Sequence, residues 1–142
     1  MTMPEQSTTP DLVAPTQRTF ELASVRDWDA LLGFYGPGLV WDMSPLGLGV
    51  YETPTAIRGF FEDWTGSYEK YELEAEQVLD LGNGVVLAVA LQRGRLPGGS
   101  GWVELRYASV VTWAEGLVVR ITNYGDLDEG RAAAERLAAS MD

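Results

Sequence analysis

The sequence predicts an α+β domain shaped as a cone, in which a curved, mainly antiparallel sheet wraps around three N-terminal helices. One observation behind this prediction is that three long runs of apolar and aromatic residues lie between positions 85 and 124. Turn residues at 97–101 and 115–116 separate these runs, so the runs fold back on one another as hairpins. The second observation is that each run is about ten residues long, against the usual five or six of a strand. A sheet of such long strands, made from a short chain, must curl around something.

Three helices are expected before the long strands, and they supply what the sheet curls around. The first spans residues 16–24. The second spans residues 28–35 after the capping residue Asp27, has apolar residues at i, i+3, i+4 and i+7, and stops at the Gly-Pro-Gly of 36–38. A short strand, 39–43, follows. The third helix begins after Thr53, which caps it ahead of a proline, and its apolar face is formed by Ile57, Phe60, Phe61 and Trp64.

The remaining elements complete one domain. Residues 71–81 alternate between apolar and mostly glutamate side chains, which is typical of a strand with one face in water. A turn at 82–84 connects this strand to the long ones, and a short C-terminal helix follows Asp126 or Asp128. Residues 1–15, rich in Pro, Ser and Thr, are expected to form a disordered or loosely ordered arm. The domain is therefore assigned to residues 16–142.

Composition and charge exclude several classes of function. The chain has 142 residues, a net charge of −11, no Cys and no His. A field this negative repels nucleic acids. Because thiolate and imidazole ligands are missing, no metal site is expected. No nucleotide-binding motif is present, so no cofactor is expected either. No apolar run approaches the roughly 20 residues that span a membrane, so no membrane partner is expected and the predicted location is cytoplasmic.

The order of these elements, together with three phrases, resembles the SnoaL-like branch of the NTF2-like superfamily. The phrases are LGFYGPGLVWDM, TPTAIRGFFEDW and EGLVVRITNYGD, and the likeness runs from about Thr16 to Ala139. The superfamily includes ketosteroid isomerases, polyketide cyclases, epoxide hydrolases and many members without catalytic activity. The resemblance implies a conical pocket for a small, largely apolar molecule, and often a homodimer formed through the outer face of the sheet.

The resemblance also implies a catalytic role for Asp42. In the ketosteroid isomerases, the carboxylate that shuttles the proton stands between the second and third helices, where VWDMSPLG places Asp42. A carboxylate that faces an apolar hollow has a raised pKa, so Asp42 would serve as the base. The two oxyanion donors of the isomerases correspond here to Thr19 and Ser109. The alternative is that Asp42 accepts hydrogen bonds from backbone amides in the SPLG turn.

Two other branches of the superfamily use acids at positions where this chain differs. The epoxide hydrolase set corresponds to Ala88, Ala90 and Asn123, and an amide cannot act as the base that activates water. That mechanism is therefore excluded. The polyketide cyclases use an acid in the late strands, for which Asn123 and Asp126 are the nearest matches, and only Asp126 is ionisable.

Strand alternation predicts which side chains point into the hollow. Ser109 and Asn123 are expected to point inward, either to hold a ligand or as a buried polar pair satisfied by each other or by water. Tyr35, Trp64 and Tyr107 are expected to line the pocket and contact the ligand. Plain packing in the core or in a dimer contact is the alternative for these three aromatic residues.

Charged side chains also recur along the late strands. Glu104, Arg106 and Arg120 have even spacing, which favours a ladder of salt bridges on the outer face of the sheet or an ion pair in a dimer. Gln92, Arg93 and Arg95 are expected near the mouth of the cone, where an arginine could bind a ligand carboxylate.

Three functions are consistent with these observations. The first is an enzyme of the isomerase or cyclase type, without a metal, that moves a proton on a small lipophilic substrate with Asp42 as base. The second is a non-catalytic ligand-binding or accessory protein of the same shape, whose only charged pocket residue is already held by backbone donors. The third is a dimerisation module in which packed side chains fill the cone.

Overall fold

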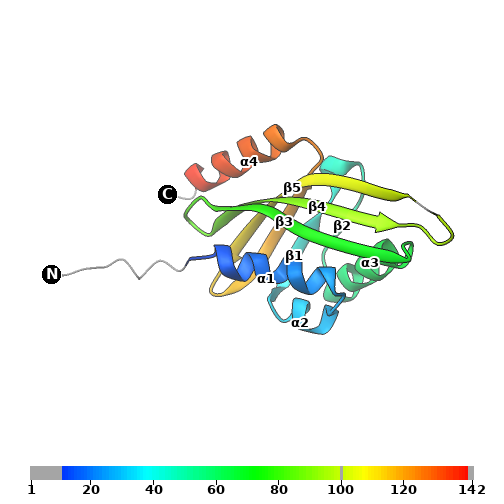
Figure 1. Ribbon diagram of the computed structural model, residues 1–142. Coiled ribbons are helices and arrows are strands. Elements are labelled where there is room, and N and C mark those ends of the chain that lie inside the picture. Colours follow the sequence, from blue (N-terminus) through cyan, green and yellow to red (C-terminus); the bar gives the residue numbers. More distant parts are fainter. Residues whose placement is uncertain (1–10, 100, 141–142) are drawn as a thin grey trace.

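A six-stranded mixed sheet with helices on both faces makes up the computed structural model, which describes residues 11–99 and 101–140 (Figure 1). In chain order the elements are α1 (Val13–Ser24), α2 (Trp28–Leu32), β1 (Tyr35–Asp42), the 3-10 helix η2 (Ser44–Leu46), β2 (Val50–Tyr51), α3 (Pro54–Gly66), β3 (Lys70–Asp80), β4 (Val85–Arg95), β5 (Trp102–Ala114), β6 (Leu117–Tyr124) and α4 (Leu127–Ser140). The strand order is β2-β1-β6-β5-β4-β3, and within the described ranges only β1 and β6 pair in parallel. The predicted α+β cone, with its mainly antiparallel sheet and short C-terminal helix, is confirmed.

The inner face of the sheet packs against α1, α2 and α3. Apolar side chains of these helices and of the strands form the largest buried cluster, which includes Leu22, Leu31, Ile57, Phe61, Val86 and Val118. Two buried or half-buried hydrogen bonds attach α1 to the sheet. Trp113 Nε1 donates to Thr16 Oγ1 at 3.0 Å, and the Leu73 amide donates to Ser24 Oγ at 3.0 Å. Helix α1 is therefore fixed to both β5 and β3 around the inner face.

Helix α4 covers part of the outer face, opposite the other helices (Figure 1). It begins where Asp126 Oδ1 accepts a hydrogen bond from the Glu129 amide, so the predicted capping by Asp126 is confirmed. Its buried residues are the small Gly130, Ala134 and Ala138. Small residues let the helix axis approach the sheet closely, above the apolar side chains of β4 and β5.

The boundary between α2 and β1 differs from the prediction. Helix α2 ends at Leu32 and Tyr35 already belongs to β1, where it pairs with Val118 of β6. The apolar residue at i+7 therefore reflects a strand side chain that faces the same core, and not a further helical turn. The Gly-Pro-Gly of 36–38 lies within β1, because the pairing register shifts between Tyr35 and Val40 and the irregularity accommodates these residues.

The N-terminal region is only partly described. Residues 1–10 of the predicted arm lie outside the described residues. The first helix begins at Val13, three residues before its predicted start at Thr16. Within the part of the chain that the structure describes, no helix has both the length and the apolar character needed to cross a membrane.

We expect Gly130→Ala to lower the free energy of unfolding by about 1–3 kcal/mol, because overpacked contacts cost this much. A Cβ at Gly130 would lie 2.5 Å from the Cβ of Ala108, so α4 would have to move away from the sheet. The matched control is Gly59→Ala in α3, where an added Cβ meets nothing within 4 Å. Replacing that glycine should increase stability by up to about 1 kcal/mol. Urea unfolding measures both values, and equal effects of the two substitutions would contradict this account of α4 packing.

Candidate functional site

A cavity lies between the inner face of the sheet and the N-terminal helices. Its volume is about 60 Å³, and its lining comes from α1, α2, β1, α3, the late strands and the residues around η2. One water molecule needs roughly 10–15 Å³ of such cavity volume, so the cavity has room for roughly four to six waters. That is the size of a single-ring molecule, and a four-ring steroid would require the lining side chains to move.

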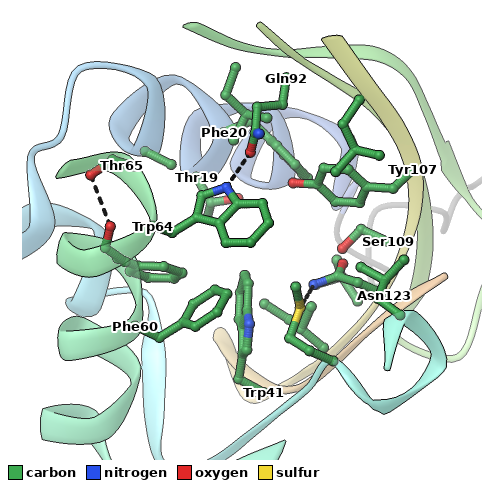
Figure 2. Close-up of a pocket in the computed structure, with 18 of the residues that line it drawn as sticks. Thr19, Phe20, Trp41, Phe60, Trp64, Thr65, Gln92, Tyr107, Ser109 and Asn123 are labelled. Carbon is green, nitrogen blue, oxygen red and sulfur yellow. Dashed lines mark hydrogen bonds between the residues drawn. The ribbon is translucent and has the colours of Figure 1, made fainter. Parts of the chain in front are cut away.

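Aromatic side chains from β1 and α3 form one wall of the cavity (Figure 2). The rings of Trp41 and Phe61 meet edge to face with their centroids 4.9 Å apart, and those of Phe60 and Trp64 stack at 5.6 Å. Three of these residues occupy the predicted apolar face of α3, whose helical spacing turns them all toward the sheet. This wall is therefore aromatic and largely apolar.

Several polar groups around the cavity already have partners. Thr19 Oγ1 donates to the Thr16 carbonyl at 2.7 Å, and Thr65 Oγ1 donates to the Phe61 carbonyl at 2.9 Å. Trp64 Nε1 donates to Gln92 Oε1 at 2.5 Å, which joins α3 to β4 across the cavity (Figure 2). The same oxygen accepts from the Tyr71 hydroxyl at 3.4 Å. These groups shape the cavity, and their hydrogen-bonding capacity is largely used.

The opposite wall carries polar groups without partners. Tyr107 and Ser109 point into the cavity from β5, and Asn123 points into it from β6 (Figure 2). Ser109 and Asn123 are paired neighbours on these two adjacent strands. No hydrogen bond joins these three side chains within residues 11–99 and 101–140. Asn123 Nδ2 donates to Met43 Sδ at 2.9 Å, while Asn123 Oδ1 is buried and has no partner among the described residues. Trp41 Nε1, on the aromatic wall, is also buried and unpaired there.

The ionisable groups in the cavity are tyrosines, and they stay neutral. Burial raises the pKa of the Tyr35, Tyr71 and Tyr107 hydroxyls well above the ordinary value. Repulsion from the charge that an ionised Tyr35 would carry adds to the rise in the pKa of Tyr107. All three therefore remain protonated at neutral pH. None of the described residues that line the cavity is charged.

Asp42 does not line this cavity, which corrects the prediction for it. Its carboxylate accepts hydrogen bonds from Ser44 Oγ at 2.6 Å, the Ser44 amide at 2.9 Å and Arg120 at 2.8 Å. Desolvation acts to raise the pKa of Asp42, but the bonds to Ser44 and the Arg120 charge outweigh it and hold the pKa below its usual value. The expected raised pKa in an apolar hollow is therefore wrong, and the alternative of hydrogen bonds from the turn is confirmed.

Asp42 lies outside the cavity because side chains alternate between the two faces along β1. Trp41 pairs with Ile121 and Asp42 with Thr122 in the parallel register with β6. Trp41 and Ile121 line the cavity, so their neighbours along each strand point to the outer face. Asp42 consequently meets Arg120, which lies on that outer face. The position of Asp42 at the end of a short strand was predicted correctly, but its face was not.

The other predicted site residues lie at the cavity. Tyr35, Trp64, Tyr107, Ser109 and Asn123 all line it, and contact of each with a ligand stays a prediction. Sequence reasoning missed Gln92 and Tyr71 as lining residues. Alternation along 85–95 carried the signal for Gln92, which is 3% exposed and lies on the same face as Ala88 and Ala90.

The outer face carries charged residues that are paired with one another. Arg93 binds Glu104 at 3.0 Å and Glu72 at 3.2 Å, and Arg106 binds Glu76 at 2.6 Å. The predicted ladder is thus on the expected face, but its partners extend to β3. Arg93 does not reach the cavity. No group of three or more Asp or Glu residues that could hold a metal ion occurs within the described ranges.

Comparison with known proteins decides the family. The model of the SnoaL-like domain family matches residues 16–121, which is most of the chain. The chain belongs to the SnoaL-like family. No curated protein matches the sequence of this SnoaL-like chain at a significant level.

Solved structures share the fold of this SnoaL-like domain at low sequence identity. A putative polyketide cyclase from Xanthomonas campestris is 19% identical over 91% of this chain and 95% of that one, with a TM-score of 0.66. TerC co-crystallised with polyporic acid is 16% identical over 82% and 92%, with a TM-score of 0.64. A Catenulispora acidiphila protein with a ketosteroid isomerase-like fold, in complex with trimethylamine, is 13% identical over 89% and 93%, with a TM-score of 0.67. At these identities the likeness establishes the fold alone.

We expect Asp42→Asn to lower the free energy of unfolding by about 1–2 kcal/mol at pH 7, because it weakens charge-assisted hydrogen bonds to a largely buried carboxylate. Folding lowers the pKa of Asp42, so its contribution is complete above the pKa of the unfolded chain, about 3.9, and fades as the pH falls below it. The difference in stability between wild type and Asp42→Asn should therefore be constant from pH 7 to 5 and shrink below pH 4.

Urea unfolding at a series of pH values measures this difference. The matched control is Asp29→Asn, because Asp29 also binds an arginine but its side chain is 87% exposed. That substitution should change stability by less than about 1 kcal/mol at every pH. An effect of Asp42→Asn that grows on acidification would mean that the Asp42 carboxylate has a raised pKa after all.

Proposed function

We propose that this SnoaL-like domain is a receptor for one small, uncharged, mainly apolar molecule, which it holds in the cavity without changing it chemically. The observation that supports this proposal is that the described lining of the cavity is aromatic, aliphatic or neutral and polar throughout. A buried charge without a partner costs several kcal/mol, so a cavity of this kind favours neutral occupants. Its volume of about 60 Å³ suits a single ring.

The state of the ionisable groups argues against proton transfer as the function. A general base works best when its pKa lies near the operating pH. Among the described residues that line the cavity, the ionisable groups are tyrosine hydroxyls whose pKa is raised by burial, and these are not bases at neutral pH. Asp42 would have to leave both Arg120 and Ser44 and cross to the other face of β1. Catalysis of the isomerase or cyclase type with Asp42 as base is therefore the weaker alternative.

Two of the structural relatives support a small-molecule occupant. TerC was co-crystallised with polyporic acid, and the Catenulispora acidiphila protein is a complex with trimethylamine. Both proteins share the fold of this chain, and their ligands are small molecules. The cytoplasmic location stays a prediction.

We also propose that the chain forms a homodimer through the outer face of the sheet. Helix α4 covers the part of this face around Leu87, which leaves the part around Arg93 and Arg106 open. Trp102, at the start of β5, is 38% exposed and packs on the Arg93 guanidinium at 4.8 Å. An amphipathic surface of this kind, with an aromatic anchor beside arginines, suits a protein contact.

The receptor proposal predicts a ranking of three single-ring probes of nearly equal size. We expect benzyl alcohol to bind, and benzylamine in its ammonium form and benzoate to bind at least about 10-fold more weakly. The net charge of −11 would by itself favour the ammonium ion, so the comparison separates the cavity lining from the overall field. Titration followed by the indole N–H signals in NMR measures the three affinities. Tightest binding of benzylamine would indicate an anionic site and would sink the proposal.

The dimer proposal predicts a molar mass of twice one chain in light scattering coupled to size-exclusion chromatography. We expect Trp102→Asp to shift the protein toward the monomer, because it places a charge in the apolar part of the contact. The control is Leu48→Asp, since Leu48 is similarly exposed, at 40%, but follows η2, away from the outer face of β5. A wild-type protein that is monomeric at high micromolar concentration would contradict the dimer.

A further inference from the structure

Tyr107, Ser109 and Asn123 form the polar wall of the cavity. The hydrogen-bonding groups on this wall indicate which polar group a ligand needs. Asn123 is fully buried and Ser109 is 2% exposed, so neither side chain reaches bulk water. Buried polar atoms without partners cost about 1–3 kcal/mol each. A ligand that supplies the missing partners would recover this free energy.

The missing partner of Asn123 is a hydrogen-bond donor. Its Nδ2 donates to Met43 Sδ, which is the sensible orientation of the amide, because a thioether sulfur can only accept. This orientation leaves Oδ1 as the unpaired atom. Thioether sulfur is a weak acceptor, so the amide is only weakly held in this orientation. A ligand must bring an N–H or O–H group to satisfy it.

The missing partner of Tyr107 is a hydrogen-bond acceptor. Its hydroxyl stays protonated, lines the same wall and has no hydrogen bond to another described residue. Tyr107 and Ser109 lie two residues apart on β5, so both side chains point to the same face beside Asn123 (Figure 2). The wall therefore carries an acceptor and a donor on the same face of the sheet.

We propose that the ligand is a small cyclic alcohol or phenol, whose hydroxyl donates to Asn123 Oδ1 and accepts from the Tyr107 hydroxyl. This inference rests on the receptor function proposed above and narrows it to a chemical class. A hydroxyl can both donate and accept, whereas a carbonyl can only accept and leaves Asn123 Oδ1 unpaired. A hydrocarbon leaves both protein atoms unpaired. The ring of the ligand packs against Trp41, Phe60 and Trp64 on the opposite wall.

The test compares benzyl alcohol, benzaldehyde and toluene, which share one ring and differ in the polar group. For the wild-type protein we expect benzyl alcohol to bind at least about 3-fold more tightly than benzaldehyde. Tyr107→Phe and Asn123→Leu should each weaken benzyl alcohol about 3- to 10-fold without weakening the binding of toluene. Titrations followed by the indole N–H signals give all of these affinities.

The control is Tyr124→Phe, the residue after Asn123 on β6, which lies on the outer face against the cluster under α4. It should change none of the three affinities. If Asn123→Leu does not fold, Tyr107→Phe and the ligand comparison on the wild type still decide the matter. Benzaldehyde that binds as tightly as benzyl alcohol, or variants that weaken toluene equally, would overturn the alcohol class and leave the uncharged receptor standing. Absence of binding by all three probes would overturn both proposals.

Discussion

The arrangement of the site depends on one constraint, the parallel pairing of β1 with β6. This pairing fixes the register at Trp41 with Ile121 and Asp42 with Thr122. Because side chains alternate along a strand, a shift by one residue would exchange the two faces of β1 and bring Asp42 into the cavity. The observed register places an indole inside and the carboxylate outside, beside Arg120. The neutrality of the cavity follows from this single register.

The sequence was sufficient for the elements whose signals are local. The hairpins from β3 to β6, the capping of α3 by Thr53 and the inward direction of Ser109 and Asn123 follow from turn residues and alternation over a few positions. The face of β1 could not be obtained in this way. Its partner is some 80 residues away in the chain, its pairing register shifts between Tyr35 and Val40, and the preceding helix is shorter than its apolar pattern indicates. No local pattern reports a register set by so distant a strand.

The family resemblance predicted the fold correctly but placed Asp42 on the wrong face of β1. The family match covers a domain of many functions, and the structural relatives, at 10–19% identity, share only the course of the backbone. Neither carries information on the role of one side chain. Asp42 stands in a phrase like that of the isomerases, yet its carboxylate takes its hydrogen bonds from Ser44, two residues later, and from Arg120. Three donors stabilise the charged form of this carboxylate, which keeps its pKa low and favours a structural role.

The lining of the cavity includes buried polar atoms that lack hydrogen-bond partners, which costs free energy of folding. Two of the three buried unpaired polar atoms found in the described residues, Trp41 Nε1 and Asn123 Oδ1, belong to side chains that line it. Apolar side chains of similar volume would avoid the cost of burying these atoms, which is about 1–3 kcal/mol each. Elsewhere around the cavity the polar groups are paired, as the bond from Trp64 to Gln92 illustrates. Local violations of this kind are expected where a protein binds something. None of the described residues that line the cavity is charged, so a neutral group that can both donate and accept a hydrogen bond is the partner that would suit these two atoms.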